Sequence, residues 1–227
     1  KVQLDLLRVL DIPYNIISKD DCEIEKKISK SIKIAIKENR PVAIVVKKGT
    51  FDTYKPFTQI INNKLMTREN SLEIILNNLP ENSIIVSTTG KTSREIFEIR
   101  EREGQSHQQD FLTVGSMGHC SSIALGIAIA KPERKIICID GDGALIMHMG
   151  SLSTVGKLKP SNYYHILINN QVHESVGGQI TAAENINFST LVKSQGYKNA
   201  YFADNNEKLI LNISEFINRA GPSFLEI

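Results

Sequence analysis

Residues 136–145 read Ile-Ile-Cys-Ile-Asp-Gly-Asp-Gly-Ala-Leu, and residues 163–170 read Tyr-Tyr-His-Ile-Leu-Ile-Asn-Asn. The first apolar run ends at Asp142 between two glycines, and the second ends at Asn169 and Asn170. A helix-length segment separates the two runs, as a crossover helix separates neighbouring parallel strands. Open parallel sheets bind ligands at the carboxyl ends of their strands. The sequence therefore predicts that Asp142 and Asn170 lie together at such an edge.

Segments with strand and helix patterns alternate over the rest of the chain. Strands that are apolar on both faces are typical of a parallel sheet covered by helices. The predicted fold class is therefore α/β, a doubly wound parallel sheet with helices on both faces. Strands are expected at residues 84–86, 111–114, 135–139, 164–168, 199–202 and 223–227. Helices are expected at residues 71–78, 93–102, 121–130, 145–157 and 207–219.

The N-terminal part of the chain carries its own helix and strand patterns. A short helix is expected before Pro13, a second helix is expected to be capped by Asp20 and Asp21, and residues 41–46 form an expected strand. A chain that begins without methionine and ends within an expected strand is interpreted as a piece of a longer protein. We interpret residues 1–50 as the tail of an earlier αβ domain, residues 51–66 as a linker and residues 67–227 as a second domain.

The composition is that of an ordinary globular protein. The 227 residues are 41% hydrophobic and 23% charged, with a formal net charge of +2, which predicts a packed core. No basic stripe with interleaved aromatic residues indicates a nucleic acid partner. No apolar run approaches the roughly 20 residues of a membrane span. We therefore expect a cytoplasmic protein, in which Cys22, Cys120 and Cys138 lack metal-ligand spacing and are interpreted as reduced thiols.

The segment around Asp142 combines two features that favour opposite charges. The free N–H groups at the start of a helix favour an anion such as a phosphate, whereas the carboxylate of Asp142 repels one. A magnesium ion between the two removes the conflict, because Mg²⁺ takes oxygen ligands from carboxylates, amides and phosphates. The dinucleotide fingerprint is excluded because Ile146 stands where its third glycine belongs, and no Walker lysine follows a glycine loop.

Gly141-Asp142-Gly143 followed by Asn169-Asn170 resembles the metal-diphosphate signature of the thiamine diphosphate enzymes. The segments 88–90 and 115–118 fall where this superfamily has its other two cofactor loops. More narrowly, residues 110–119, 141–150 and 173–179 resemble the phosphonopyruvate decarboxylases, and the related sulfopyruvate decarboxylases share much of this pattern. The resemblance covers essentially the whole chain.

The resemblance implies a role for each residue of these motifs. It implies that Asp142 and Asn170 hold Mg²⁺ through their side chains, with Asn169 as the alternative to Asn170, and that Val172 holds it through its backbone carbonyl. It implies that Gly143 and Ala144 give backbone N–H groups to the diphosphate and that Gly141 also contacts the cofactor. It implies further cofactor contacts at Thr89, Gly90, Lys91, Gly115, Ser116 and Met117, with Met117 as the apolar wedge that bends the cofactor.

The reaction implied by the resemblance is the decarboxylation of 3-phosphonopyruvate to phosphonoacetaldehyde and CO2, with thiamine diphosphate and Mg²⁺. Sulfopyruvate or another 2-oxoacid is an alternative substrate, and a non-catalytic binding domain of the same fold is an alternative function. His119 and His173 are the candidate catalytic residues, because both lie in loops at expected strand ends. The second anion of such a substrate needs donors, for which Lys91, Arg94 and His119 are available.

The resemblance also implies a partner for this chain. In this family the active site lies between two domains, usually from two chains, and the pyrimidine-side domain supplies a catalytic glutamate. No segment of this sequence matches the one that carries that glutamate. The chain is therefore expected to hold half of an active site, to be inactive alone and to work within a homo-oligomer, a dimer or larger.

Overall fold

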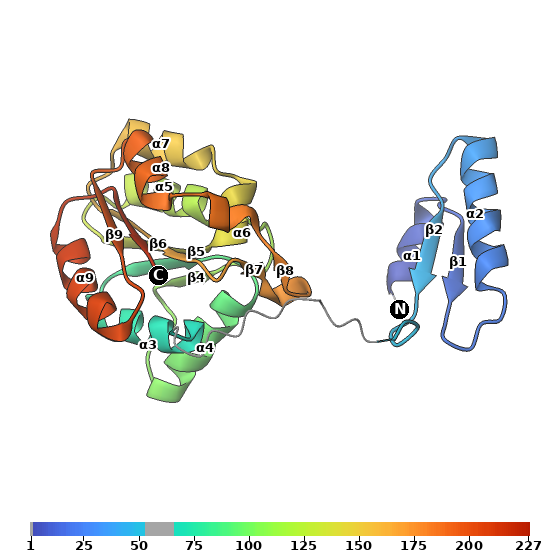
Figure 1. Cartoon of the computed structure of the whole chain (residues 1–227), viewed down its shortest axis with the longest axis horizontal. Helices are drawn as coiled ribbons and strands as arrows, with labels where there is room; N and C mark the ends of the chain where they lie inside the picture. The colour runs from blue at the N-terminus through green and yellow to red at the C-terminus, as the bar shows by residue number, and fades with distance from the viewer. Residues whose placement is uncertain (1, 53–65) are drawn as a thin grey trace. The chain divides into compact units, whose positions relative to one another are not determined.

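The computed structural model describes residues 2–52 and 66–227, which form two compact units that divide between residues 58 and 59 (Figure 1). Each unit is described by itself. Most of the linker expected at residues 51–66 lies outside the described residues. In the described part of the chain, no helix is both long enough and apolar enough to cross a membrane.

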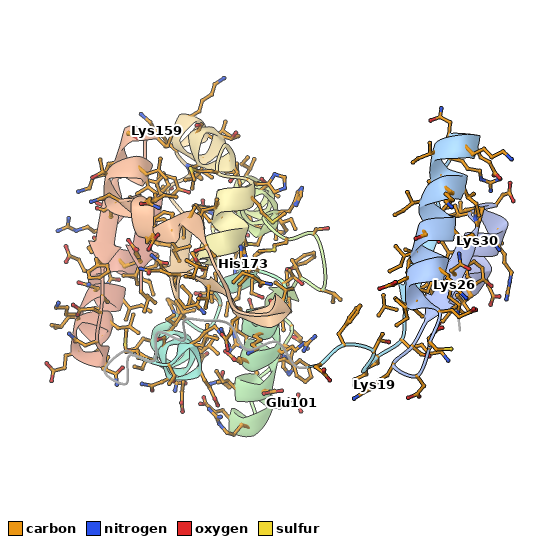
Figure 2. The ribbon with its side chains drawn as sticks, turned by 45° about the vertical axis from the view of Figure 1, so that its right-hand side comes forward. Lys19, Lys26, Lys30, Glu101, Lys159 and His173 are labelled. Carbon is orange, nitrogen blue, oxygen red and sulfur yellow. The ribbon has the colours of Figure 1, made fainter. Side chains whose placement is uncertain are left out.

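The smaller unit contains α1 (Val2–Val9), β1 (Tyr14–Ile17), α2 (Ile24–Glu38) and β2 (Ala43–Val46). The two strands pair in parallel across α2, with Tyr14 opposite Ala43. Strand β1 was not expected, because four residues directly after a helix carry too short a pattern to distinguish it from a turn. Lys26 and Lys30 project from the exposed face of α2 (Figure 2).

The prediction that Asp20 and Asp21 cap the second helix was wrong. Glu23 occupies the N-cap of α2 without a side-chain hydrogen bond. Asp21 instead accepts a hydrogen bond from the backbone N–H of Glu23 at 3.0 Å, so it stabilises the turn that precedes the helix. Acidic residues near the start of a helix interact favourably with the helix dipole even when they do not cap the helix.

The larger unit is built on a six-stranded parallel sheet in the order β4-β3-β5-β6-β10-β9. The strands are β3 (Ile84–Ser87), β4 (Asp110–Leu112), β5 (Ile136–Gly141), β6 (Tyr163–Ile168), β9 (Asn199–Phe202) and β10 (Ser223–Glu226). Every residue of β6 is buried, as expected for a central strand covered on both faces. The structure confirms the predicted α/β fold class.

Helices cover both faces of this sheet (Figure 1). The helices α3 (Arg68–Asn78), α4 (Lys91–Glu103) and α9 (Asn206–Asn218) pack on one face. The other face is covered by α5 (Cys120–Ala130), α6 (Asp142–Met147), α7 (Ser151–Leu158) and α8 (Phe188–Ser194). Strand β5 contributes to both cores, because Ile137 and Ile139 face the first group while Ile136 and Cys138 face the second.

The single helix expected at residues 145–157 was wrong. The structure has two helices, α6 and α7, and His148 between them leaves the helical conformation with φ −129° and ψ 40°. The ring of His148 packs against that of His119, with centroids 4.2 Å apart. The apolar residues keep a helical spacing across the break, because both helices bury residues on the same face of the sheet. This spacing therefore predicted one helix instead of two.

The strand register brings the two motifs of the opening stretch to one edge. Gly141 at the end of β5 lies opposite Ile168 at the end of β6. In the chain β3 is followed by β4, which lies on one side of β3 in the sheet. The next strand, β5, lies on the opposite side of β3, so the strand order reverses at β3. Parallel sheets place their ligands at such a reversal. A hairpin of β7 (Val172–His173) and β8 (Gln179–Ile180) follows β6.

Candidate functional site

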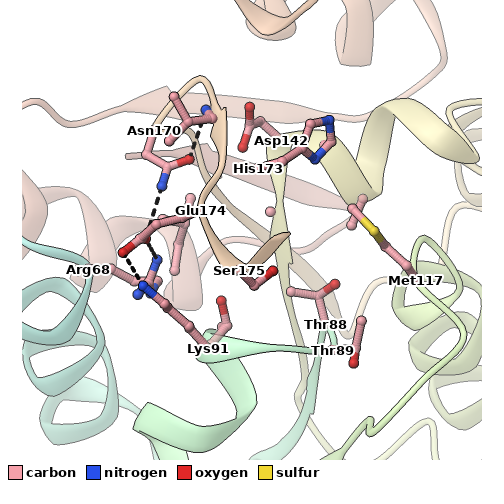
Figure 3. Close-up of a pocket in the computed structure, with 16 residues that line it drawn as sticks. Arg68, Thr88, Thr89, Lys91, Met117, Asp142, Asn170, His173, Glu174 and Ser175 are labelled. Carbon is pink, nitrogen blue, oxygen red and sulfur yellow. Dashed lines mark hydrogen bonds and ion pairs between the residues drawn. The ribbon is translucent and has the colours of Figure 1, made fainter. Parts of the chain in front are cut away.

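A cavity of about 90 Å³ opens at the carboxyl ends of β3, β5 and β6 (Figure 3). It is lined by Arg68, Thr88, Thr89, Lys91, Thr92, Met117, Gly141, Asp142, Gly143, Ala144, Ile168, Asn170, Val172, His173, Glu174 and Ser175. These residues come from the loops after β3 and before α5, from the starts of α3, α4 and α6, from the ends of β5 and β6 and from the segment after β6. The fold thus brings polar side chains from distant parts of the sequence into one small cavity.

Asp142 is the first residue of α6 and is only 3% exposed. Its Oδ2 atom accepts a hydrogen bond from the Thr181 hydroxyl group. Burial raises the pKa of the Asp142 carboxyl group, and the hydrogen bond from Thr181 opposes this shift. The carboxylate is held in place by a neutral donor, so its negative charge is available to a cation.

The imidazole of His173 lies against the backbone of Gly143, next to Asp142 (Figure 3). A Cβ atom on Gly143 would come within 2.4 Å of the His173 ring. A side chain at position 143 would therefore displace the ring, and glycine permits the close approach. This contact holds a candidate catalytic histidine at the start of α6.

Asn170 lies at the turn between β6 and β7. Its Oδ1 atom accepts a hydrogen bond from the backbone N–H of Val172 at 3.2 Å, and its Nδ2 atom donates to Glu174 at 3.4 Å. The neighbouring Asn169 turns away and donates to Glu226 on β10 at 2.7 Å. The structure thus distinguishes the two asparagines, because only Asn170 lines the cavity.

Two cations and a carboxylate form the opposite wall of the cavity (Figure 3). Glu174 forms ion pairs with Lys91, at 2.6 Å, and with Arg68. Arg68 also forms a bidentate ion pair with Glu95, with both N–O distances 2.6 Å. The Lys91 and Arg68 charges lower the pKa of Glu174, with the hydrogen bond from Lys91 the largest cause. The carboxylate of Glu174 thus lies where two cations and an amide N–H converge.

The loop after β3 and the loop before α5 complete the cavity. The Thr89 hydroxyl group donates to the carbonyl of Val114 at 2.7 Å and so ties the two loops together. The Thr88 hydroxyl oxygen is buried and has no hydrogen-bond partner among the described residues. A buried polar atom without a partner is costly. Thr88 therefore indicates that the cavity accepts a polar ligand.

The structure does not bring every predicted site residue to the cavity wall. Gly90, Gly115, Ser116 and His119 are not among the lining residues. Gly90 precedes α4 with φ +96°, and Gly115, Ser116 and His119 lie on the exposed loop before α5. The backbone carbonyls of Ser116 and Met117 lie 3.2 and 3.3 Å from His119 Nδ1. Of the two candidate catalytic histidines, only His173 lines the cavity.

Sequence reasoning missed several residues of this site. Arg68 and Glu174 are separated by 106 positions, and nothing in the sequence indicates their ion pair. Thr181, which holds Asp142, lies outside every motif that was recognised. The resemblance of residues 173–179 to a known segment did include Glu174, and a charged residue beside a candidate catalytic histidine was the one available signal.

Comparison with known proteins identifies the family. Residues 88–227 match the family described as thiamine pyrophosphate enzyme, C-terminal TPP binding domain. The chain belongs to this family. The matched region begins at Thr88 and includes every strand of the six-stranded sheet except β3, together with every motif discussed above.

Related proteins of this family include decarboxylases. Phosphonopyruvate decarboxylase of Streptomyces viridochromogenes is 34% identical over 161 residues, which make up 71% of this chain and 39% of that protein. The chain thus spans about two-fifths of that relative's length. Sulfopyruvate decarboxylase subunit beta of Methanocaldococcus jannaschii is 42% identical over 123 residues, which make up 54% of this chain and 62% of that subunit. The family resemblance stated from the sequence is confirmed.

A solved structure shows the same fold. The X-ray structure of a putative thiamin diphosphate-dependent enzyme from Mycobacterium smegmatis superimposes with a TM-score of 0.59. The match covers 78% of this chain and 36% of that one at 18% sequence identity. At this identity the likeness concerns the fold alone.

Proposed function

We propose that the cavity binds the diphosphate of thiamine diphosphate through a magnesium ion. The observation that supports this most directly is the position of Asp142 and Asn170 at the ends of adjacent strands, next to the first N–H groups of α6. Mg²⁺ takes carboxylate, amide and phosphate oxygens together. The unpartnered hydroxyl group of Thr88 in the same cavity supports a polar ligand.

Each proposed metal ligand offers an oxygen atom at the cavity wall. We assign the side chains of Asp142 and Asn170 and the backbone carbonyl of Val172 as the ligands. The Asn170 Oδ1 atom already accepts a hydrogen bond from the N–H of Val172, so its second lone pair is the one available to the ion. We assign the backbone N–H groups of Gly143 and Ala144 to the diphosphate.

When bound, thiamine diphosphate supplies a nucleophilic carbon for the keto group of a 2-oxoacid and stores the electrons released with CO2. The residues of this chain position and shield that chemistry. Met117 enters the cavity from the loop before α5 and is the apolar support for the bent cofactor (Figure 3). We assign the carbonyl of Gly115 as an acceptor for the pyrimidine amine, and His173 as the group that contacts the substrate.

We propose that the enzyme to which this chain contributes decarboxylates 3-phosphonopyruvate. The similarity to phosphonopyruvate decarboxylases supports this choice, and the similarity to sulfopyruvate decarboxylase subunits makes sulfopyruvate the second candidate. The test compares release of CO2 from the two acids and from pyruvate by the intact protein. A higher kcat/KM for phosphonopyruvate than for sulfopyruvate is expected, and the reverse order would establish the second candidate.

We propose that residues 1–50 belong to the pyrimidine-side domain and that another domain, from the same or a neighbouring subunit, completes the site. Several apolar side chains of the smaller unit are exposed, including Ile36 at 77% and Val46 at 45%. In the larger unit Val114 is 96% exposed beside the loop assigned to the pyrimidine. Exposed apolar side chains of this kind are typical of surfaces that a partner covers.

The chain alone is expected to bind thiamine diphosphate and Mg²⁺ without turning over substrate, because the catalytic glutamate of this family has no counterpart in its sequence. The measurement is CO2 release in the presence of both cofactors, with calorimetry to confirm binding. Turnover at the rate of the intact protein would contradict the half-site assignment. Absence of binding by the intact protein as well would favour a non-catalytic domain.

Replacing Lys91 with methionine is expected to weaken binding of the cofactor diphosphate. A hydrogen bond that involves a charged group contributes about 1.5–3 kcal/mol, so the dissociation constant should rise about 10- to 150-fold. Calorimetric titration of thiamine diphosphate with Mg²⁺ measures the change. Lys208→Met is the matched control, since Lys208 on α9 forms a similarly exposed ion pair with Asp204, which precedes that helix. Equal affinities of the two variants would exclude Lys91 from the diphosphate site.

A further inference from the structure

A second group of polar side chains lies in the core between the sheet and α5. Cys138 and Asp140 are alternate residues of β5, so their side chains share one face of the sheet. His165 on β6 is the register partner of Cys138 and faces the same way. Cys120, the first residue of α5, packs against this face. All four side chains are at most 1% exposed.

The ligand atoms of Cys120, Cys138 and Asp140 lie close together, and His165 lies beside Asp140. The sulfur atoms of Cys120 and Cys138 are 3.6 Å apart, and both lie within 4.8 Å of a carboxylate oxygen of Asp140. The Oδ2 atom of Asp140 lies 3.7 Å from Nε2 of His165. Two thiols and a carboxylate therefore lie together in the protein interior, with an imidazole beside the carboxylate.

Two of the converging atoms lack ordinary partners. Neither Asp140 Oδ2 nor His165 Nε2 has a hydrogen-bond partner among the described residues. Their separation of 3.7 Å exceeds that of a normal hydrogen bond. Buried polar atoms are costly when unpaired. A cation between the four groups would satisfy both atoms at once.

The distances match those of a tetrahedral zinc site. Zinc–sulfur bonds of about 2.3 Å place two sulfur ligands about 3.8 Å apart at the tetrahedral angle. Zinc–nitrogen and zinc–oxygen bonds of about 2.1 Å place those two ligands about 3.4 Å apart. The observed separations of 3.6 and 3.7 Å lie close to these values.

The surrounding hydrogen bonds orient the ligands toward the same point. The Tyr197 hydroxyl oxygen lies 3.1 Å from Nδ1 of His165 and can accept a hydrogen bond from the Nδ1–H tautomer, which leaves the lone pair of Nε2 free. The Oδ1 atom of Asp140 accepts a hydrogen bond from the N–H of Gly141 at 3.0 Å, which directs Oδ2 toward the cluster. Ligands of metal ions are commonly oriented by such outer partners.

We propose that Cys120, Cys138, Asp140 and His165 form a structural site for a zinc-class metal ion. Four protein ligands fill the coordination shell, which is typical of structural rather than catalytic zinc. The ion would link the start of α5 to β5 and β6. Its ligand Asp140 directly precedes Gly141-Asp142-Gly143 in the sequence. This site is separate from the proposed magnesium site and does not depend on the proposed function.

Metal analysis of the full chain tests the proposal. The protein is produced with zinc in the medium, purified under reducing conditions and analysed by mass spectrometry for metals. About one zinc per chain is expected, since the ligands form a single site. Cys120→Ser and Cys138→Ser should lose the metal, whereas Cys22→Ser should keep it, because Cys22 is the exposed free cysteine and serves as the matched control.

A measurement on the unsubstituted chain tests the proposal even if the cysteine variants fail to fold. Replacement of zinc by Co²⁺ should produce thiolate-to-cobalt charge-transfer absorption in the near ultraviolet and intense tetrahedral bands in the visible range. Absence of both zinc and these bands would overturn the proposal. Metal retained in both cysteine variants, or a disulfide between Cys120 and Cys138 found in the purified chain, would overturn it as well.

Discussion

The substitution Asp142→Asn is expected to weaken magnesium-dependent binding of thiamine diphosphate by at least about 100-fold, the upper end of the loss seen when only an outer partner of a metal ligand is removed. Asparagine keeps the shape of the side chain and one oxygen atom but removes the negative charge that a hard cation prefers. The Thr181 hydroxyl group can still donate to that oxygen, so the local fold should persist. Isothermal titration of the cofactor, with and without Mg²⁺, measures the loss.

The control for Asp142 is Asp204→Asn. Asp204 is exposed at the start of α9 and forms an ion pair with Lys208 at 2.8 Å, so it shares the chemistry of Asp142 without lining the cavity. The control should bind the cofactor like the unsubstituted chain. Cofactor binding by Asp142→Asn with unchanged affinity and unchanged dependence on Mg²⁺ would place the metal elsewhere.

The substitution Gly156→Ala is expected to destabilise the larger unit by about 3 kcal/mol, at the upper end of the range for overpacked cores. A Cβ atom at position 156 would lie 1.7 Å from the backbone carbonyl oxygen of Gln195, which follows α8. Backbone atoms cannot rotate aside as a side chain does, so α7 and α8 must separate. For a domain of this size the melting temperature should fall by about 6–12 °C, which calorimetry measures.

Gly126→Ala is the matched control for Gly156→Ala. Gly126 is also a helical glycine, but it is exposed on α5 and a Cβ atom there meets nothing within 4 Å. Alanine should stabilise this helix by up to about 1 kcal/mol, because it loses less conformational freedom on folding. A fall in melting temperature of similar size in both variants would show that the contact with Gln195 is not the cause.

Much of the fold could be predicted because the signals are local. Strands β5 and β6 are continuous apolar runs, and such runs are typical of central parallel strands. Because the carboxyl ends of parallel strands share an edge, the position of Asp142 and Asn170 at one edge of the sheet followed from the strand pattern alone. The break between α6 and α7 could not be predicted from a local pattern. The conformation of His148 at this break accompanies a contact with His119 on another segment.

The sequence by itself determined the fold class, the edge of the sheet that holds the cavity and the family to which the chain belongs. Each of these depends on a local pattern, either of apolar residues along a strand or of a short motif at its end. Only the tertiary structure brought Arg68 to Glu174, Thr181 to Asp142 and Cys120 to Cys138. These contacts join segments that are far apart in the chain. A local pattern of residues cannot predict which distant segments the sheet brings together.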